Sequence, residues 1–593
     1  MTKLNNMKRY IVILTAIALA CPILAQETNE EINRDVVVER EYIPEIEESN
    51  KVNTIPKITE EKVEKAKINY NIATFPTMET NYNLRPIPVS ELSKIKKKEY
   101  VNKGFARVGA GYPLNLLGDF YYPLLQSNSY ILGIDLHHRS TWLNNVRFYN
   151  KGDRAQATVM NNDGMLNFKK SFTDNILFSE IKVTNDYFHY YGKDGLVREG
   201  NTLPSYKLND EVMAVRGDSI TTKNNFMGVD FEIGLKSKPE YEKFEYSVLA
   251  EYNFFSQQTG SNEHAFELKA DISKEVLDDF SVGGEMAIEG NFYKFNSHKF
   301  SDSRYFFDAS IEDSINHMKL ELLPYIKYSH SIFDLYAGAD FELEFAKKTH
   351  FVVSPKVRFD MSVVKNLFYL YAQVWGGVTK NSMRNIAQEN LYVTPNIRIE
   401  DTYNPLNLGL GFKVRIVPKL IFDVFVDYKI IKDQYFYTNA PVLSATNTYL
   451  NTFDVVYSDA KVFDASASLT YDWSEKVTAF VKGAYHKWNC KEIDYAWYKP
   501  EYDVEAGVSY RVIRDFELSL SYNLLGNRRY ETPEGTAEKM RTLHDLRFNA
   551  TYDISPNVSV FAECHNMTGA QYELWYGYPA MRFNCLAGFI FVF

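Results

Sequence analysis

Apolar and polar residues alternate along most of the chain from about residue 104 onward. Clear runs cover 333–345, 408–416, 420–429 and 501–511. A period of two is typical of strands whose two faces meet different surroundings. The runs last about 10–16 residues, near the ~9–11 that a tilted membrane-spanning strand needs and above the ~5–6 of soluble sheets. The pattern predicts an all-β fold, a transmembrane antiparallel β-barrel.

Short polar turns and longer polar connections alternate between these runs. Examples of short turns are 126–128, 173–175, 418–419 and 474–476, and the long connections include 192–221, 380–404, 438–453 and 531–539. Outer-membrane barrels have short periplasmic turns and longer outer loops, so the count predicts about 22 strands, within a range of 20 to 24. Two places leave the count open. The sequence 161–164 (Asn-Asn-Asp-Gly) signals a hairpin inside one expected strand, and 304–314 could form a further strand.

The N-terminal region has a different character. Residues 1–25 predict a secretory signal peptide, with basic residues before an apolar stretch at 10–20 and a small-residue cleavage site ending at Ala25. A lipoprotein-type cleavage before Cys21 is a weaker alternative. Residues 26–102 are charged and contain five prolines. They predict an extended periplasmic arm with one short helix near 60–67, and leave 103–593 for the barrel.

Composition narrows the class of protein. Aromatic residues make up 15% of the 593 residues, which excludes a disordered chain. After the leader, no apolar run approaches the ~20 residues of a spanning helix. Net charge is −10, so a nucleic-acid partner has little support.

The C-terminal segment resembles the closing hairpin of TonB-dependent receptors. The resemblance rests on 565–568 (His-Asn-Met-Thr), 572–579 (Tyr-Glu-Leu-Trp-Tyr-Gly-Tyr-Pro) and the terminal Phe593. A second short segment, Asp35-Val36-Val37-Val38-Glu39, resembles a TonB box, which an energy-coupling inner-membrane protein pulls as an added strand. A plain extended linker is the alternative for these five residues.

The arm is too short for that family's plug domain. The arm and residues 104–112 together resemble a group of plugless barrels. This resemblance does not indicate a function. A barrel of ~22 strands is wide, so the arm, inward-folded outer loops or a partner must fill the lumen. One hypothesis pairs arm carboxylates, such as Glu45 and Glu60, with bases of the inner wall.

Charged residues on the predicted inner face are the candidate site. They are Asp334, Asp340, Glu342, Glu344, Lys356, Arg358, Lys413, Arg415, Asp423 and Asp427. Opposite charges on neighbouring strands would pair across the sheet. The set is therefore either a salt-bridged wall or a path that selects a solute.

Other possible sites receive simpler interpretations. His137 and His138 would point to opposite faces of a strand, which argues against a shared metal ion. Arg216-Gly217-Asp218 is a chance tripeptide rather than an adhesion motif. Cys564 and Cys585 are expected on the lipid-facing side, as free thiols rather than a disulfide, although the compartment permits one. No catalytic motif is present, so neither an enzyme nor a cofactor is expected.

Two functions remain open at this point. The first is an outer-membrane transport protein that resembles TonB-dependent receptors and lacks a full plug, with an unknown solute. The second is a structural or assembly barrel within a larger outer-membrane complex. Expected partners are outer-membrane lipid and either the energy-coupling protein or a surface or periplasmic protein. Both functions place the protein in the outer membrane of a diderm bacterium.

Overall fold

The computed structural model describes the barrel region of the chain. The described residues are 104–143, 146–147, 154–155, 157–189, 223–238, 244–258, 260–295, 316–346, 349–394, 397–441, 449–532 and 536–593. The predicted signal peptide, arm and TonB-box-like segment, the tripeptide 216–218 and the possible strand at 304–314 lie outside them.

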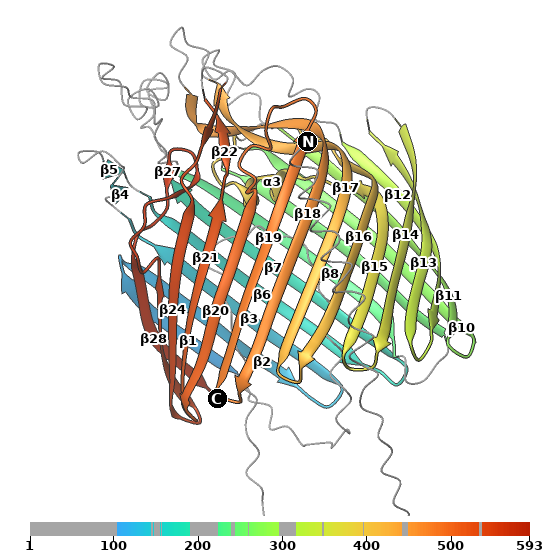
Figure 1. Ribbon diagram of the computed structural model, residues 1–593, viewed down its shortest axis with the longest axis horizontal. Helices are drawn as coiled ribbons and strands as arrows, with labels where there is room; N and C mark the ends of the chain where they lie inside the picture. The colour runs from blue at the N-terminus through green and yellow to red at the C-terminus, as the bar shows by residue number, and fades with distance from the viewer. Residues whose placement is uncertain are drawn as a thin grey trace, which may run out of the picture. The chain divides into compact units, whose positions relative to one another are not determined.

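Twenty-two strands form one sheet, and each pairs antiparallel with the next along the chain (Figure 1). They are β1 (Phe105–Tyr112), β2 (Asn115–Gln126), β3 (Tyr130–Thr141), β6 (Val159–Ser171), β7 (Asn175–His189), β8 (Lys223–Ser237), β9 (Phe244–Gln257), β10 (Asn262–Leu277), β11 (Phe280–Lys294), β12 (His317–Ser329), β13 (Phe333–Phe345), β14 (Thr349–Val364), β15 (Phe368–Thr379), β16 (Thr402–Val417), β17 (Leu420–Pro441), β18 (Tyr449–Ser474), β19 (Val477–Cys490), β20 (Tyr502–Ile513), β21 (Phe516–Gly526), β24 (Leu543–Ser555), β25 (Val558–His565) and β28 (Asn584–Val592). Because β1 also pairs with β28, the barrel is closed. The predicted fold class and strand number are confirmed.

Short elements occupy the connections at one end of the barrel. They are β4 (Val146–Arg147), β5 (Arg154–Ala155), α3 (Met383–Glu389), β22 (Arg529–Glu531), β23 (Ala537–Lys539), β26 (Glu573–Trp575) and β27 (Tyr578–Pro579). The connections at the opposite end are tight turns, as after β2, β6 and β16 (Figure 1). Following the asymmetry of outer-membrane barrels, we take the end with the long connections as the outer end.

The hairpin signal at 161–164 does not form a turn. These residues lie inside β6, where Asn162 pairs with His138 of β3 and with Asn185 of β7. Continuous pairing on both sides satisfies the backbone of β6, and it overrides the local turn preference of the Asn-Asp-Gly sequence.

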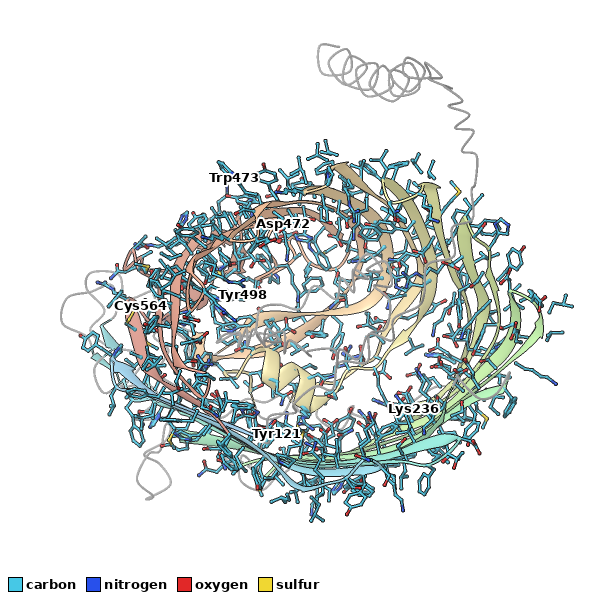
Figure 2. All side chains as sticks on the ribbon, turned by 90° about the horizontal axis from the view of Figure 1, so that it is seen from below. Tyr121, Lys236, Asp472, Trp473, Tyr498 and Cys564 are labelled. Carbon is cyan, nitrogen blue, oxygen red and sulfur yellow. A yellow bond between two sulfur atoms is a disulfide. The ribbon has the colours of Figure 1, made fainter. Side chains whose placement is uncertain are left out.

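The two faces of the sheet meet different surroundings. Figure 2 shows Asp472 on the inner side of the ring and its neighbour Trp473 on the outer side. Trp473 is 68% exposed, and many other outward apolar side chains are also exposed, such as Leu410 at 56%. In a closed barrel, every strand forms backbone hydrogen bonds with two neighbours, so no backbone polar group of the sheet faces lipid unpaired. The apolar outer side chains give the barrel a surface that suits a bilayer. Among the described residues, no helix has the length and apolar character needed to cross a membrane.

Small residues close the seam between the first and last strands. Gly109 of β1 lies opposite Gly588 of β28, and Ala110 lies opposite Ala587. A Cβ atom at Gly111 would overlap the carbonyl oxygen of Cys585, and one at Gly588 would overlap that of Val108. Glycine is therefore required here because the two backbones approach closely.

Candidate functional site

The inner wall around β12, β13 and β14 is a network of ion pairs. Lys356 lies 2.8 Å from Asp340 and 3.3 Å from Glu321. Lys319 lies 3.1 Å from Glu321 and 3.2 Å from Glu342. The carboxylates of Glu321, Asp340 and Glu342 lie close enough together to hold a metal ion. Lys319 and Lys356 lie among these three carboxylates, so the observed arrangement is a salt-bridged wall.

The other predicted lumen charges have varied surroundings. Lys413 pairs with Asp423 across β16 and β17 at 2.9 Å. Arg358 pairs with Asp360 of its own strand at 2.8 Å, and Asp427 lies 3.2 Å from Lys429. Glu344 lies 3.8 Å from His350, Asp334 lies opposite Asp360 in the β13–β14 register, and the buried Nε of Arg415 has no partner among the described residues. The structure therefore gathers these charges into separate groups along the wall rather than into one centre.

The adjacent histidines face different environments. His137 contacts the carboxylates of Asp119 at 3.0 Å and Asp135 at 3.1 Å. His138 lies 2.7 Å from the side chain of Asn162, which belongs to the neighbouring strand. The two rings therefore have separate sets of partners.

Helix α3 lies inside the ring of strands, in the connection between β15 and β16 (Figure 2). Its N-cap is Ser382, whose side chain accepts a hydrogen bond from the backbone N–H of Asn385. Met383, Ile386 and Ala387 follow at helical spacing and are completely buried. Sequence reasoning missed this helix. The signal was present, because a serine N-cap followed by apolar residues at i, i+3 and i+4 predicts a short amphipathic helix.

Two charged residues hold α3 against the wall. Arg384 forms a paired contact with the carboxylate of Asp230 in β8, with Nη2 2.8 Å from Oδ2. At the other end, Glu389 lies 3.1 Å from Nζ of Lys499 and accepts a hydrogen bond from Tyr437 at 3.1 Å. Burial alone would raise the pKa of Glu389, but Lys499 and the tyrosine hydroxyls hold it below its usual value.

Helix α3 is the centre of a buried cluster that we call the outer cap. It comprises α3, residues 390–394 and 397–399, Trp497, Tyr498, β22, β23, β26 and β27, packed on the outer parts of β7, β8, β9, β17 and β18. Tyr392 stacks on Tyr578 with ring centroids 3.6 Å apart. Trp575 contacts Tyr437, Phe453 and Tyr498. Outer connections that are far apart in sequence therefore pack together inside the outer end of the barrel.

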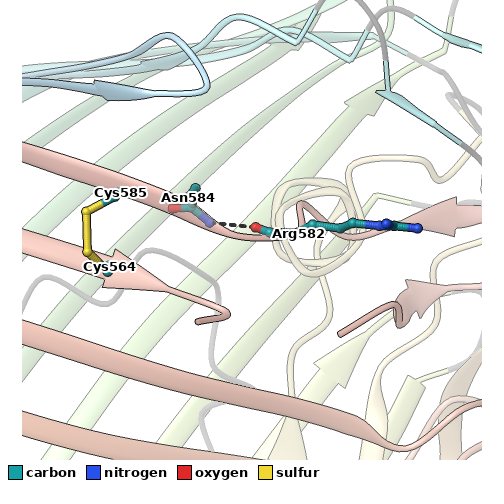
Figure 3. The surroundings of a disulfide bond; sticks show 4 residues. All are labelled: Cys564, Arg582, Asn584 and Cys585. Carbon is teal, nitrogen blue, oxygen red and sulfur yellow. Dashed lines mark hydrogen bonds between the residues drawn. A yellow bond between two sulfur atoms is a disulfide. The ribbon is translucent and has the colours of Figure 1, made fainter. Parts of the chain in front are cut away.

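Cys564 and Cys585 form a disulfide bond between β25 and β28 (Figure 3). The expectation of free thiols was wrong. The two residues are direct partners in the strand register, with Cα atoms 4.1 Å apart, so strand pairing brings the sulfur atoms together. Cys490 is the remaining cysteine within the described residues, and it is free.

Known proteins match this chain in structure and not in sequence. No protein-family model matches, and no curated protein matches. The FrpB iron transporter from Neisseria meningitidis (F3-3 variant) superposes with a TM-score of 0.61 at 10% identity, covering 85% of this chain and 83% of that one. The siderophore receptor PirA from Acinetobacter baumannii has a TM-score of 0.60 at 10% identity, covering 84% and 81%.

A third match is the ferric-catecholate import receptor Fiu from K12 E. coli in its closed form. It has a TM-score of 0.59 at 10% identity and covers 83% of this chain and 82% of that one. A TM-score of about 0.6 over more than four-fifths of both chains establishes a shared architecture despite the low identity. The described part of the chain therefore has the barrel fold that these three proteins share.

Proposed function

We propose that this protein is an outer-membrane transport protein, of the TonB-dependent-receptor kind, whose own outer connections close its lumen. The outer cap supports this proposal most strongly. A transport barrel needs a polar lumen and a removable barrier. The ion-paired inner wall supplies the first. Helix α3, held by side-chain contacts with Asp230 of the wall and with Lys499 of another outer connection, is suited to the second.

Metal complexes are the first solutes to test. The three comparison proteins are named for iron, a siderophore and a ferric catecholate, and a further structural match, with a TM-score of 0.56 at 12% identity, is the copper transporter OprC. We propose that the segment 35–39 couples transport to an inner-membrane protein, as its resemblance to a TonB box implies. The experiment deletes 35–39 in the native host and measures uptake of ferric-siderophore and copper compounds under metal starvation. A deletion of 28–32 in the same arm is the matched control. Transport predicts loss of uptake in the first strain and normal uptake in the second.

A structural role is the second candidate, and the packing of the outer cap favours it. Met383, Ile386, Tyr437 and Phe453 are almost completely buried, as in the core of a soluble protein. A cap that never opens would suit a barrel that scaffolds other envelope proteins. Stoichiometric copurification from native membranes, together with unchanged uptake after deletion of 35–39, would favour this role over transport.

A further inference from the structure

Five glutamates form a single row on the inner face of the barrel. Glu180 of β7 lies directly opposite Glu232 of β8, which lies opposite Glu251 of β9. The row continues through Glu267 of β10 to Glu289 of β11. Neighbouring residues such as Ile181, Phe231 and Leu268 are exposed on the outer face, so the glutamates point inward. We call these five residues the glutamate row.

Like charges directly opposite each other on neighbouring strands destabilise a sheet. Glu289 is neutralised by Lys319 and Lys380, each at 3.1 Å. Within the part of the chain that the structure describes, Glu180, Glu232, Glu251 and Glu267 have no ion pair. The rest of the wall is different, since Asp340, Asp423 and Asp464 each lie within 3 Å of a lysine. The four glutamates therefore lack the ion pairs that similar carboxylates have elsewhere, and Lys269, which lies beside them on β10, is already paired with Glu285 at 2.6 Å.

The chain carries a matching set of positive charges immediately before β1. Lys94, Lys96, Lys97, Lys98 and Lys103 occur within ten residues, together with one acid, Glu99. This basic segment, residues 94–103, lies outside the described residues and connects directly to the periplasmic end of β1. Its tethering gives the lysines a high effective concentration at the barrel wall.

The segment is long enough to reach the row. From β1 to β7 there are four strand spacings, or about 19 Å at ~4.8 Å each. Through the register of these strands, Phe105 is level with Lys182 of β7, so Glu180 lies two residues, or about 7 Å, from that level along the strand. The separation is thus about 20 Å, whereas the six to ten extended residues between Gly104 and Lys98–Lys94 span ~20–33 Å.

We infer that residues 94–103 bind the glutamate row, so that the chain supplies the missing cations of its own inner wall. This differs from pairing between arm carboxylates and lumen bases, because Lys356, Arg358 and Lys413 already have acidic partners in the wall. The inference concerns an intramolecular contact and does not depend on whether the barrel transports a solute.

Zero-length carbodiimide coupling tests the contact, because it joins a lysine to a carboxylate only where the two groups touch. Full-length protein in outer-membrane vesicles is coupled, digested and mapped by mass spectrometry. We expect isopeptide links from Lys94–Lys98 to Glu180, Glu232 or Glu251. Lys419 and Lys476, in periplasmic turns next to β17 and β19, are internal controls and should not link to the row. Raising the salt concentration should weaken the links several-fold, because the pairing is electrostatic.

Two sets of variants make the test decisive. Glu180→Gln, Glu232→Gln and Glu251→Gln together should abolish the links, while heat-modifiable mobility reports a folded barrel. Lys94→Glu, Lys96→Glu, Lys97→Glu and Lys98→Glu together should also abolish them, and adding Glu232→Lys should restore a link of reversed polarity. Links from Lys94–Lys98 that go elsewhere, or that persist in the glutamine variant, would overturn the inference. Protection of the row by added spermine with no lysine link would also overturn it, in favour of a path for soluble cations.

Discussion

Single side chains in this barrel have consequences set by the face on which they lie. Along β17, Val424 points outward, whereas Asp423 is buried on the inner side, where it pairs with Lys413 and accepts a hydrogen bond from Tyr371 at 2.7 Å. Two successive side chains of one strand therefore meet different surroundings, lipid on the outer face and an ion-pair network on the inner face.

Val424→Arg should reduce the stability of the membrane-embedded barrel by roughly 2–4 kcal/mol if the residue lies near the midplane. The cause is the transfer of a charged side chain into hydrocarbon. Unfolding of the variant by denaturant in lipid vesicles measures the effect, and Val424→Leu is the control. Equal stability of the arginine and leucine variants would mean that this face does not contact lipid.

Asp423→Asn should also be destabilising, by roughly 1–3 kcal/mol, because it leaves the partly buried Lys413 without its counter-charge. The expected loss of stability depends on this ion pair, because replacing an aspartate that faced open water would have little effect. A double variant with Lys413→Met should recover part of the loss, and the same denaturant titration measures it. An additive double variant would show that the two groups do not interact.

Glu389 makes the stability of the outer cap depend on pH. Its pKa is held below the usual value, so the stability it contributes is present at neutral pH and is lost as pH falls through that lowered pKa. A cysteine at the buried position Ala387, in a Cys490→Ser background, reports cap opening through its reactivity with an impermeant reagent added from outside. Because acid slows the reaction of every thiol, the labelling of this cysteine is expressed relative to that of an exposed reference cysteine at the same pH. This relative labelling should increase as the pH falls. With Glu389→Gln, it should be high at neutral pH and should change little with acid.

At the scale of the element, α3 shows how a short helix can depend entirely on its packing. Seven residues are too few for a helix that is stable alone. Its structure is maintained by one buried face, by the contact of Arg384 with Asp230 of the wall, and by the contact of Glu389 with Lys499 in the connection between β19 and β20.

Ile386→Asp should open the outer cap, because it places a charge in a completely buried site, at a cost of several kcal/mol. Planar-bilayer recordings should show larger and more frequent currents than those of the unaltered protein. Gln388→Asp is the matched control, since residue 388 lies on the exposed face of the same helix. Silent recordings from Ile386→Asp would mean that another part of the chain closes the lumen.

The disulfide belongs to the closing hairpin. It joins residues 21 apart in sequence and links β25 to β28, the strand that completes the barrel. A crosslink over a loop of this length stabilises a fold by roughly 3 kcal/mol through the unfolded state. Cys564→Ser with Cys585→Ser should therefore lower the unfolding midpoint without changing the barrel. Alkylation of the denatured protein without reductant should modify Cys490 and leave the other two protected, and alkylation of all three would contradict the disulfide.

At the scale of the whole molecule, the inward folding of the outer connections changes how topology can be tested. The connection at 380–404 contributes α3 to the outer cap, so it is a poor target for surface labelling. Lys491, in the connection between β19 and β20, has a side chain that is 72% exposed. In a Cys490→Ser background, Lys491→Cys should label on intact cells, and Lys476→Cys, in a periplasmic turn, should label only after lysis. The reverse result would invert the orientation.

The sequence by itself determined the architecture of the barrel. Alternation such as that of 408–416 fixes which side chains face lipid, and the spacing of turns fixes the number of strands, because both are local properties with a period of two. Cross-strand pairs such as Lys413–Asp423 follow the same local logic once the neighbouring strands are known.

Only the tertiary structure decided how the lumen is filled and which charges are neutralised. The outer cap joins α3 to Phe453, Trp575 and Tyr578, which no local pattern connects. The Cys564–Cys585 bond and the glutamate row depend on residue-by-residue register, and a shift of one position would destroy either. Register and loop packing are set by contacts between segments that are distant in sequence, so they cannot be read from any one segment alone.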